Sequence, residues 1–249
     1  IVITASHNPA EYNGYKVYGS DGGQITLAAA EGIMEEISKI DVLKERKAIT
    51  EWEAVQEELL YYIGDEMDRR YIDRIEKLSL LKKEEKRDIK IVYTPLHGTG
   101  LIPVTSILTK LGYYRIFLVN SQIRPDGNFP TVKAPNPEDK EAFKEAIKLA
   151  KEKEADIILA TDPDCDRVGV AVMDRAGNYI LLNGNQIGAL LCKYLLSHEG
   201  NINEKTAIIK TIVTSDLGER IAESFGASVF NTLTGFKFIG EKIMEFEQS

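Results

Sequence analysis

The alternation of strand-like and helix-like segments that begins at residue 89 constrains the fold of this chain more than any other feature. Short apolar runs predict strands there, and apolar residues at helical spacing predict the helices between them. In chain order we predict a strand at 89–94, a helix at 102–111, a strand at 114–119, a helix at 136–154 and a strand at 156–160. This β-α-β-α-β order indicates a parallel sheet flanked by helices.

Two further strands, 168–173 and 179–182, are joined by Arg175-Ala176-Gly177-Asn178, whose composition is typical of a hairpin turn. In the helix predicted at 136–154, Asn136 is expected to be the N-cap, with Pro137 at the first helical position. The α/β region is therefore expected to combine parallel and hairpin pairing.

Helical patterns occupy the chain on both sides of this region. Before it, a helix is predicted at 27–40, and a capping box of Thr50 and Glu53 opens a helical stretch to residue 75, either one long helix or two with a break near Gly64. After it come a helix at 185–196, a strand at 206–210, a helix at 216–225, a strand at 228–230 and a helix from about 238. With the charged run 82–88 interpreted as a linker, we predict a multi-domain α/β protein with units at 1–85, 86–183 and 184–249.

The composition restricts the class of protein and its partners. Hydrophobic residues make up 43% of the chain, and no apolar run approaches the roughly 18 to 20 residues that cross a bilayer. The formal net charge of −8 argues against nucleic acid but leaves small anionic substrates open, because a local cluster of Lys and Arg can outweigh it. Cys165 and Cys192 lack metal-site spacing, so we expect two reduced thiols and a cytoplasmic location. From the apolar runs and the net charge we expect neither membrane nor nucleic acid as a partner.

Three carboxylates stand at alternate positions directly after an apolar strand: Asp162, Asp164 and Asp166. Carboxylates this close repel one another unless a cation neutralises them, and such hard oxygen ligands suit Mg²⁺ or Ca²⁺. The spacing excludes an EF-hand, because Arg167 stands where that loop needs Gly and Met173 where it needs Glu. A solvated acidic turn is the alternative. Arg167 could bind a phosphate in a bidentate way or simply pair with one Asp.

A second loop, Thr4-Ala5-Ser6-His7-Asn8-Pro9, separates an apolar strand end from a turn-rich stretch. The hydroxyl of Ser6 is therefore expected to be exposed. An activated or phosphorylated serine can act as a covalent group carrier. The alternative is a turn in which these residues only satisfy backbone groups.

A third loop, Thr234-Gly235-Phe236-Lys237, follows the last predicted strand. Gly235 would let a ligand approach the backbone closely, and Lys237 could meet a phosphate or a sugar hydroxyl. A simple turn that enters a helix explains the same residues equally well.

Taken together and in order, the three loops resemble those of the α-D-phosphohexomutase family, which includes phosphoglucomutases and phosphomannomutases. Residues 4–9 are similar to its phosphoserine loop, 162–167 to its metal loop and 234–237 to part of its sugar-recognition region. The segments 93–100, and 125–130 through 135–138, are similar to further family landmarks, nearer the phosphoglucomutase branch. The resemblance covers essentially the whole chain.

The resemblance implies a partial phosphohexomutase architecture. Members of the family have four domains around a central cleft, and this chain would supply the last part of domain one, all of domain two and most of domain three. We therefore expect an internal fragment without the early part of domain one and without the phosphate-binding domain four. The Glu-x-Ser-Gly type loop that discriminates glucose from mannose is expected just beyond Ser249.

The resemblance also implies an isomerase that interconverts hexose 1-phosphate and hexose 6-phosphate, with glucose as the expected sugar and a sugar 1,6-bisphosphate as intermediate and activator. Ser6 would carry the phosphoryl group and complete the shell of a Mg²⁺ held by Asp162, Asp164 and Asp166. Lys16 is similar to the family's general acid/base, and we expect the metal and Arg167 to lower its pKa.

Further site residues follow from the same resemblance. His7 is expected either to contact phosphate or to hold its loop. The residues expected to contact the substrate are Arg167, Lys210, Thr234, Gly235 and Lys237.

Two other functions remain open. An aspartate-based phosphatase of the haloacid-dehalogenase type also places Asp-x-Asp after a buried strand, but Asp166 stands where it needs Thr or Val, and Ser6 would have no role. A non-catalytic fragment that binds sugar phosphates is the other alternative, and the 249 residues alone are expected to be inactive.

Overall fold

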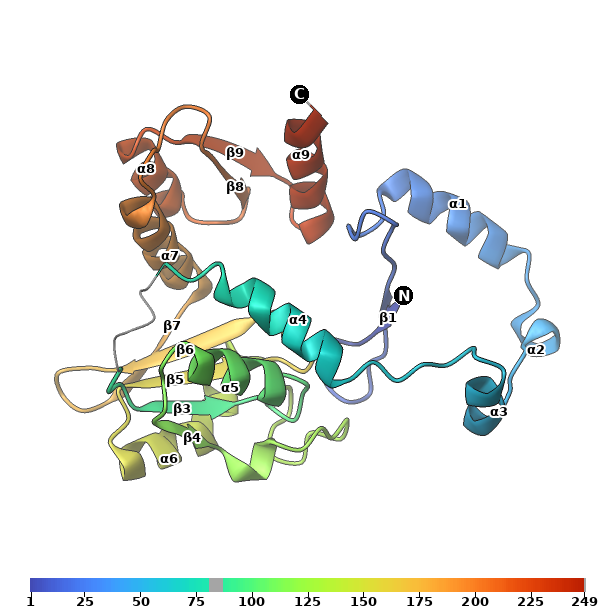
Figure 1. Ribbon diagram of the computed structural model, residues 1–249, viewed down its shortest axis with the longest axis horizontal. Coiled ribbons are helices and arrows are strands. Elements are labelled where there is room, and N and C mark those ends of the chain that lie inside the picture. The colour runs from blue at the N-terminus through green and yellow to red at the C-terminus, as the bar shows by residue number, and fades with distance from the viewer. Residues whose placement is uncertain (81–86, 249) are drawn as a thin grey trace.

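The protein is described by a computed structural model that covers residues 1–80 and 87–248 (Figure 1). The predicted linker at 82–88 and the predicted domain boundary after residue 85 lie largely outside these described residues. The described strands form a five-stranded sheet, a parallel pair and a short antiparallel pair. That pair joins β1 (Val2–Ile3) to β2 (Tyr15–Lys16) and closes the loop that contains Ser6.

The five-stranded sheet has the order β4-β3-β5-β6-β7. Its strands are β3 (Ile91–Thr94), β4 (Ile116–Leu118), β5 (Ile157–Thr161), β6 (Val168–Met173) and β7 (Tyr179–Leu182). β4, β3 and β5 run parallel, whereas β6 and β7 are antiparallel to their neighbours. The prediction of a mixed α/β sheet, with a hairpin between its last two strands, is confirmed.

One face of this sheet carries the main hydrophobic core. Period-2 alternation turns Val92 and Ile158 toward η2 (Lys140–Phe143) and α6 (Lys144–Lys153), where Phe143 and Ala146 are fully buried. The connection between β3 and β4 is α5 (Leu101–Lys110), a helix that packs against α4 (Asp65–Glu76). The core includes Leu96, just after β3, and Ala160 near the end of β5, so it reaches the carboxyl ends of both strands.

The predicted helix start at Asn136 is wrong. Asn136 Oδ1 accepts a hydrogen bond from Glu138 N (3.0 Å), which makes an isolated turn, and helical structure begins only after Asp139 caps η2. The reason is tertiary packing, because the backbone of Pro137 lies close against Gly169 of β6: a Cβ on Gly169 would stand 1.9 Å from Pro137 O. The Asn-Pro-Glu-Asp signal is compatible with both structures.

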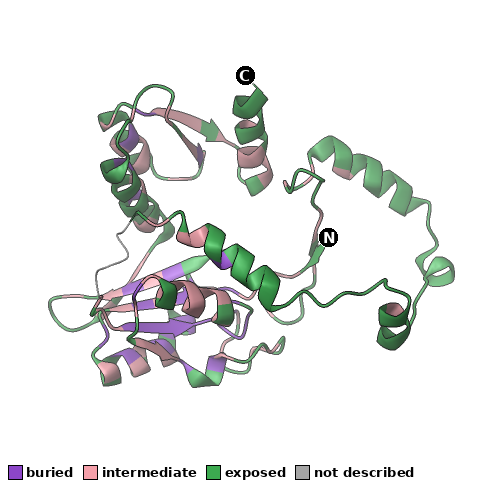
Figure 2. Cartoon of the chain, in the orientation of Figure 1, coloured by how far each residue is buried: buried purple, intermediate pink, exposed green. Residues whose placement is uncertain are grey.

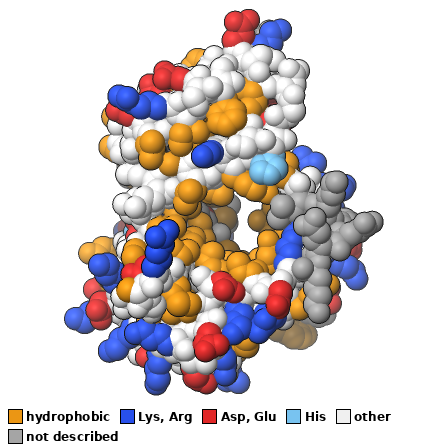
Figure 3. All heavy atoms as spheres, turned by 90° about the vertical axis from the view of Figure 1, so that its left-hand side faces the viewer, with side chains coloured by type: hydrophobic (Ala, Val, Ile, Leu, Met, Phe, Trp, Pro, Cys, Tyr) orange, Lys and Arg blue, Asp and Glu red, His pale blue; other side chains and the backbone are white. Residues whose placement is uncertain are grey.

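The C-terminal unit builds a smaller core. It comprises α7 (Gly184–His198), β8 (Ala207–Thr211), α8 (Asp216–Ser224), β9 (Ser228–Thr232) and α9 (Phe236–Gln248). Leu196, Ala222 and Ala227 are its buried centre. On the face shown in Figure 3, hydrophobic side chains gather around an opening between this unit and the five-stranded unit.

The N-terminal region has almost no interior of its own (Figure 2). Its helices are α1 (Leu27–Ser38), α2 (Val42–Glu45), α3 (Glu51–Gln56) and α4. The capping box of Thr50 and Glu53 is present, and the stretch it opens forms two helices rather than one. Ile72 on α4 is the one buried side chain among residues 1–80. Within the described residues no helix is both long enough and apolar enough to cross a membrane.

Candidate functional site

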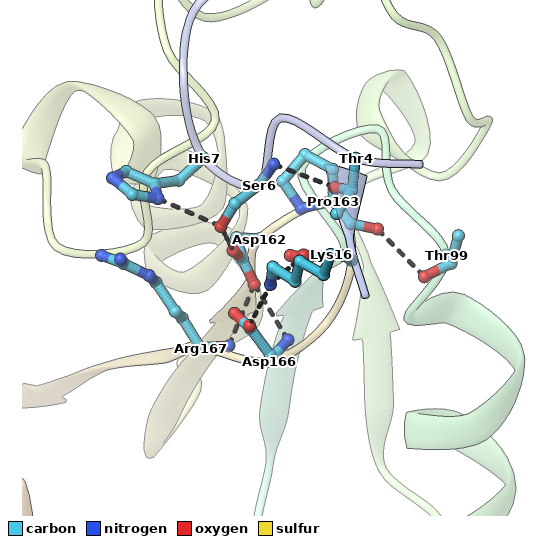
Figure 4. Close-up of polar contacts among 10 residues, drawn as sticks. Thr4, Ser6, His7, Lys16, Thr99, Asp162, Pro163, Asp166 and Arg167 are labelled. Atoms are coloured by element: carbon cyan, nitrogen blue, oxygen red, sulfur yellow. Dashed lines mark hydrogen bonds and ion pairs between the residues drawn. The ribbon is translucent and has the colours of Figure 1, made fainter. Parts of the chain in front are cut away.

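Two segments far apart in the chain meet at the carboxyl end of β5 (Figure 4). Ser6 Oγ donates a hydrogen bond to Asp162 Oδ2 at 2.9 Å. Lys16 Nζ lies 3.0 Å from Asp164 Oδ2 and 2.9 Å from Asp166 Oδ2. The fold therefore brings the Ser6 loop onto the loop of three carboxylates.

Asp162 is built into the sheet rather than exposed on a turn. It is the residue directly after β5, and it is fully buried. Its Oδ1 accepts the backbone N–H groups of Asp166 (3.1 Å) and Arg167 (3.0 Å), and Cys165 N donates to its carbonyl (2.9 Å). These bonds curl the loop so that Asp164 and Asp166 point toward one another. The alternative of a solvated acidic turn does not describe this loop.

The carboxylates of Asp162, Asp164 and Asp166 fit a hard divalent cation. Each offers an oxygen, and the three oxygens lie within 4.8 Å of one another. Among the described side chains, Asp164 Oδ1 is the buried polar atom that has no hydrogen-bond partner. A buried anionic oxygen without a donor is costly unless a cation satisfies it. This donor set matches what Mg²⁺ takes from proteins.

The pKa values of the two inner carboxyls diverge. Burial raises the pKa of Asp162 to about 6, against the opposing effect of the Arg167 N–H bond. Burial also acts to raise the pKa of Asp164, but hydrogen bonds and charge from Lys16 leave it below its usual range. Asp164 therefore stays ionised to lower pH than Asp162, which takes up a proton more readily.

The protein side chains alone do not produce the lowering of the Lys16 pKa that was expected from a bound metal and Arg167. Burial alone would lower the pKa, but the hydrogen bonds to Asp166 and Asp164 outweigh burial and raise it. Lys16 is therefore a firmly charged ammonium that bridges two carboxylates across the interface of the two loops.

Ser6 and His7 form the other side of the site. Ser6 has a left-handed backbone (φ +53°), and its N–H donates to Thr4 Oγ1 at 2.9 Å. His7 Nδ1 lies 3.2 Å from Ser6 Oγ. Burial and the charge of Arg167 lower the pKa of His7 despite three nearby carboxylates. Figure 4 shows the Arg167 side chain extending on the same side of the loop as His7.

The loop 95–100 supports the carboxylate loop from behind. Thr99 donates both its N–H and its hydroxyl to Pro163 O, each at 2.9 Å. Gly98 makes this contact possible, because a Cβ there would stand 2.3 Å from Pro163 Cα. Gly100 is similarly crowded by Tyr93 OH.

The other predicted substrate residues lie on the C-terminal unit. Lys210 is buried at the end of β8 and pairs with Asp216 and Glu219, both at 3.3 Å. Thr234 and Gly235 form the turn before α9, and Gly235 has φ +133°. Lys237 lines a groove of about 330 Å³ between α9 and residues 21–26. Within the described part of the chain, neither lysine bonds to the Ser6 or Asp162 loops.

Sequence reasoning missed several residues that shape this site. Thr4 holds the backbone of Ser6, and Gly14 lets Thr4 O approach so closely that a Cβ would stand 2.9 Å away. Thr99 lies in the segment 93–100 that resembles a family landmark, but its contact with Pro163, 64 residues away, could not be read from the sequence. The available clues were the turn-rich composition around Gly14 and the family-like segments that contain Thr4 and Thr99.

The chain matches three domain models of the phosphoglucomutase/phosphomannomutase family in order. Residues 1–44 match its α/β/α domain I, 69–177 its domain II and 183–249 its domain III. A phosphoglucomutase from Staphylococcus haemolyticus is 37% identical over 249 residues, which are 100% of this chain and 45% of that protein. One from Staphylococcus saprophyticus is 39% identical over 243 residues, 98% of this chain and 44% of that protein. The chain thus spans about half the length of these curated relatives.

Solved structures show the same fold. A phosphoglucomutase/phosphomannomutase family protein from Burkholderia thailandensis matches 99% of this chain and 47% of its own, at 24% identity and a TM-score of 0.73. An N-acetylphosphoglucosamine mutase from Aspergillus fumigatus, in complex with GlcNAc-6P and magnesium, matches 98% of this chain and 57% of its own, at 18% identity and a TM-score of 0.60. This chain therefore belongs to the phosphoglucomutase/phosphomannomutase family.

Proposed function

We propose that the protein carrying this chain is a phosphohexomutase that interconverts hexose 1-phosphate and hexose 6-phosphate, with glucose as the sugar. The observation that carries the proposal is the hydrogen bond from Ser6 Oγ to Asp162 Oδ2, beside two further carboxylates and Lys16. A hydroxyl held on a carboxylate cluster of this kind suits a group that receives and returns a phosphoryl group. The named phosphoglucomutase relatives support glucose.

Ser6 is the proposed carrier. In the first transfer the bond from phosphorus to Ser6 Oγ breaks and a bond to the free hydroxyl of the sugar monophosphate forms, while the Lys16 ammonium gives a proton to Ser6 Oγ and takes up the proton of that hydroxyl. The second transfer returns the other phosphate of the sugar 1,6-bisphosphate to Ser6. A Mg²⁺ held by Asp162, Asp164 and Asp166 would neutralise negative charge on the transferring group.

Two neighbouring side chains are proposed to orient the substrate, Arg167 as a cation and His7 as a hydrogen-bonding ring. Arg167 and His7 lie beside Ser6. A substrate phosphate that reaches this position would accept two parallel hydrogen bonds from the Arg167 guanidinium. Lys16 is proposed as the acid/base. It begins the cycle protonated, because its carboxylate partners raise its pKa. Lys210, Thr234, Gly235 and Lys237 are proposed as sugar contacts from the C-terminal unit.

The test is phosphate mapping on the protein that carries this chain. After incubation with Mg²⁺ and glucose 1,6-bisphosphate, intact mass and peptide mapping should show one phosphate on Ser6, and a sugar monophosphate should discharge it. Ser6→Ala should carry none. An unmodified Ser6, or phosphate on Asp162, would reject the mutase proposal and favour a binding protein or a phosphatase.

The 249 residues alone are proposed to be inactive, since they span 45% of a curated relative. The domain ranges 1–85, 86–183 and 184–249 also remain a proposal. Turnover by the isolated chain would contradict the first of these statements.

A further inference from the structure

A connected set of polar side chains lies behind the carboxylate loop and has no role in the proposed chemistry. Thr94 Oγ1 donates to Gln122 Oε1 at 2.7 Å, and Gln122 Nε2 donates to Thr131 Oγ1 at 2.8 Å. His97 Nε2 lies 2.8 Å from the same Thr131 hydroxyl. Thr94 and Gln122 are fully buried, and His97 is 4% exposed. We call these four residues the Gln122 network.

The Gln122 network holds an unusual turn. Leu96 and His97 both have left-handed backbones, with φ of +46° and +64°, although neither is glycine. Leu96 N donates to Thr94 Oγ1 at 3.1 Å, and His97 N donates to the carbonyl of Gln122 at 2.9 Å. Consecutive left-handed residues with side chains persist only where their surroundings enforce them. Thr94 and Gln122 of the network hold both residues in this conformation, because they accept the hydrogen bonds of the two backbone N–H groups.

The next two residues of this turn, Gly98 and Thr99, contact the carboxylate loop at Pro163. Gly98 approaches Pro163 so closely that no Cβ fits, and Thr99 donates twice to Pro163 O. Pro163 stands between two of the carboxylates, Asp162 and Asp164. A shift of the turn would therefore move the backbone that carries both side chains.

We propose that Gln122 and Thr131 are positioning residues for the candidate metal loop, acting through the turn at 96–99. The proposal rests on the proposed function for the role of the 162–166 loop as a metal site. The positioning of that loop by the turn at 96–99 concerns only residues of this chain. His97 contributes through the hydrogen bond between its Nε2 and the Thr131 hydroxyl. Partners that orient ligating carboxylates typically change metal affinity by about 10- to 100-fold when removed.

The test compares Gln122→Met, which keeps side-chain length but removes both hydrogen bonds, with the unmodified protein that carries this chain. Hydrogen exchange measured without metal should be about tenfold faster at the amides of Asp166 and Arg167, which bond to Asp162 Oδ1. Mn²⁺ alone, as the probe, should bind about tenfold more weakly in calorimetry. Thr131→Val should shift both readouts in the same direction, and Thr131→Ser should restore them.

Two further variants keep the outcome decisive. Thr105→Val removes a hydroxyl bonded to Leu101 O on α5, outside the network, and should leave both readouts unchanged. Thr131 is exposed, so Thr131→Val serves if Gln122→Met fails to fold. Faster exchange at 96–99 with unchanged exchange at 162–167 would overturn the proposal, as would no change in either segment. If Ser6 takes no phosphate while the exchange effect holds, the proposed function fails and the positioning role stands.

Discussion

The two halves of the candidate site are supported in opposite ways. The Asp162 loop extends from β5 over a core in which Val92, Ile158 and Phe143 are fully buried. The Ser6 loop belongs to a region where Ile72 is the one buried side chain among residues 1–80. Figure 2 shows this contrast between the purple sheet and the green N-terminal helices.

The contrast shows what holds each half of the site in this chain. The carboxylates are fixed by packing and backbone hydrogen bonds, whereas the Ser6 loop contacts them through side chains, the Ser6–Asp162 hydrogen bond and the Lys16 ion pairs. Regions with few buried contacts open locally at low free-energy cost. The carboxylate loop is therefore a platform held by the packing of this chain, and the Ser6 loop is attached to it through the side-chain contacts of Ser6 and Lys16.

The largest expected effect separates the two regions by stability. Phe143→Ala removes a fully buried ring from the sheet core and should lower the free energy of unfolding by about 3–5 kcal/mol. Trp52→Ala removes an aromatic side chain that is 71% exposed on α3 and should change it by about 0.5 kcal/mol or less. Urea denaturation followed by circular dichroism measures both. Equal losses would mean that the N-terminal region has a packed core of its own.

The next effect concerns the contact that braces the carboxylate loop. Gly98→Ala places a Cβ 2.3 Å from Pro163 Cα and 2.6 Å from Pro163 O, and both are backbone atoms. Because backbone must move, we expect a loss of about 3 kcal/mol of stability, together with weaker Mn²⁺ binding. Gly127→Ala is the matched control, since a Cβ there meets nothing within 4 Å. If the two variants behave alike, the brace is not needed.

The sequence predicted the platform better than the contacts made to it. Local patterns were enough for β3, β5 and the three carboxylates, because strand periodicity and spacing are properties of neighbouring residues. The meeting of Ser6 with Asp162, 156 residues apart, was anticipated from family resemblance and not from any pattern.

Other features could not be predicted because tertiary packing decides them. The left-handed Leu96 and His97 carry no glycine signal, and the turn at Asn136 uses the same residues that would start a helix. Apolar spacing predicted α1 correctly but not that Met34 on it would stay 56% exposed. The carboxylate partners that raise the pKa of Lys16 in the absence of a metal also come from a distant segment, so their effect could not be read from local sequence.

A smaller effect tests how firmly Asp162 is buried in the platform. Its pKa in the folded state is about 6, against 3.8 for the unfolded chain, so the folded state keeps a proton that the unfolded state releases between these values. Stability from this group is therefore complete below pH 4 and is lost as the pH rises through 6. The free energy of unfolding should fall by on the order of 2 kcal/mol across this window relative to Asp162→Asn. A constant difference between the two proteins from pH 4 to 7 would place Asp162 in a more solvated setting.

The smallest expected effect on stability concerns the ion pairs that join the two halves. Lys16→Met removes an ammonium that is 28% exposed, and such pairs contribute about 1 kcal/mol or less. Mn²⁺ binding should nevertheless tighten by about tenfold, because a fixed positive charge leaves two of the carboxylates that would hold the cation. Calorimetric titration of Mn²⁺ against both proteins measures the change.

Lys110→Met is the matched control for this comparison. Lys110 also bridges two carboxylates, Asp73 and Glu76 of α4, but it is the last residue of α5 and bonds to none of the three candidate metal ligands. Its loss should change stability by a similar small amount and leave Mn²⁺ binding unchanged. Weaker Mn²⁺ binding in Lys16→Met would show that the ammonium organises the carboxylates rather than competing for them. The Ser6 half would then be part of the platform, because the carboxylate loop would depend on it for its shape.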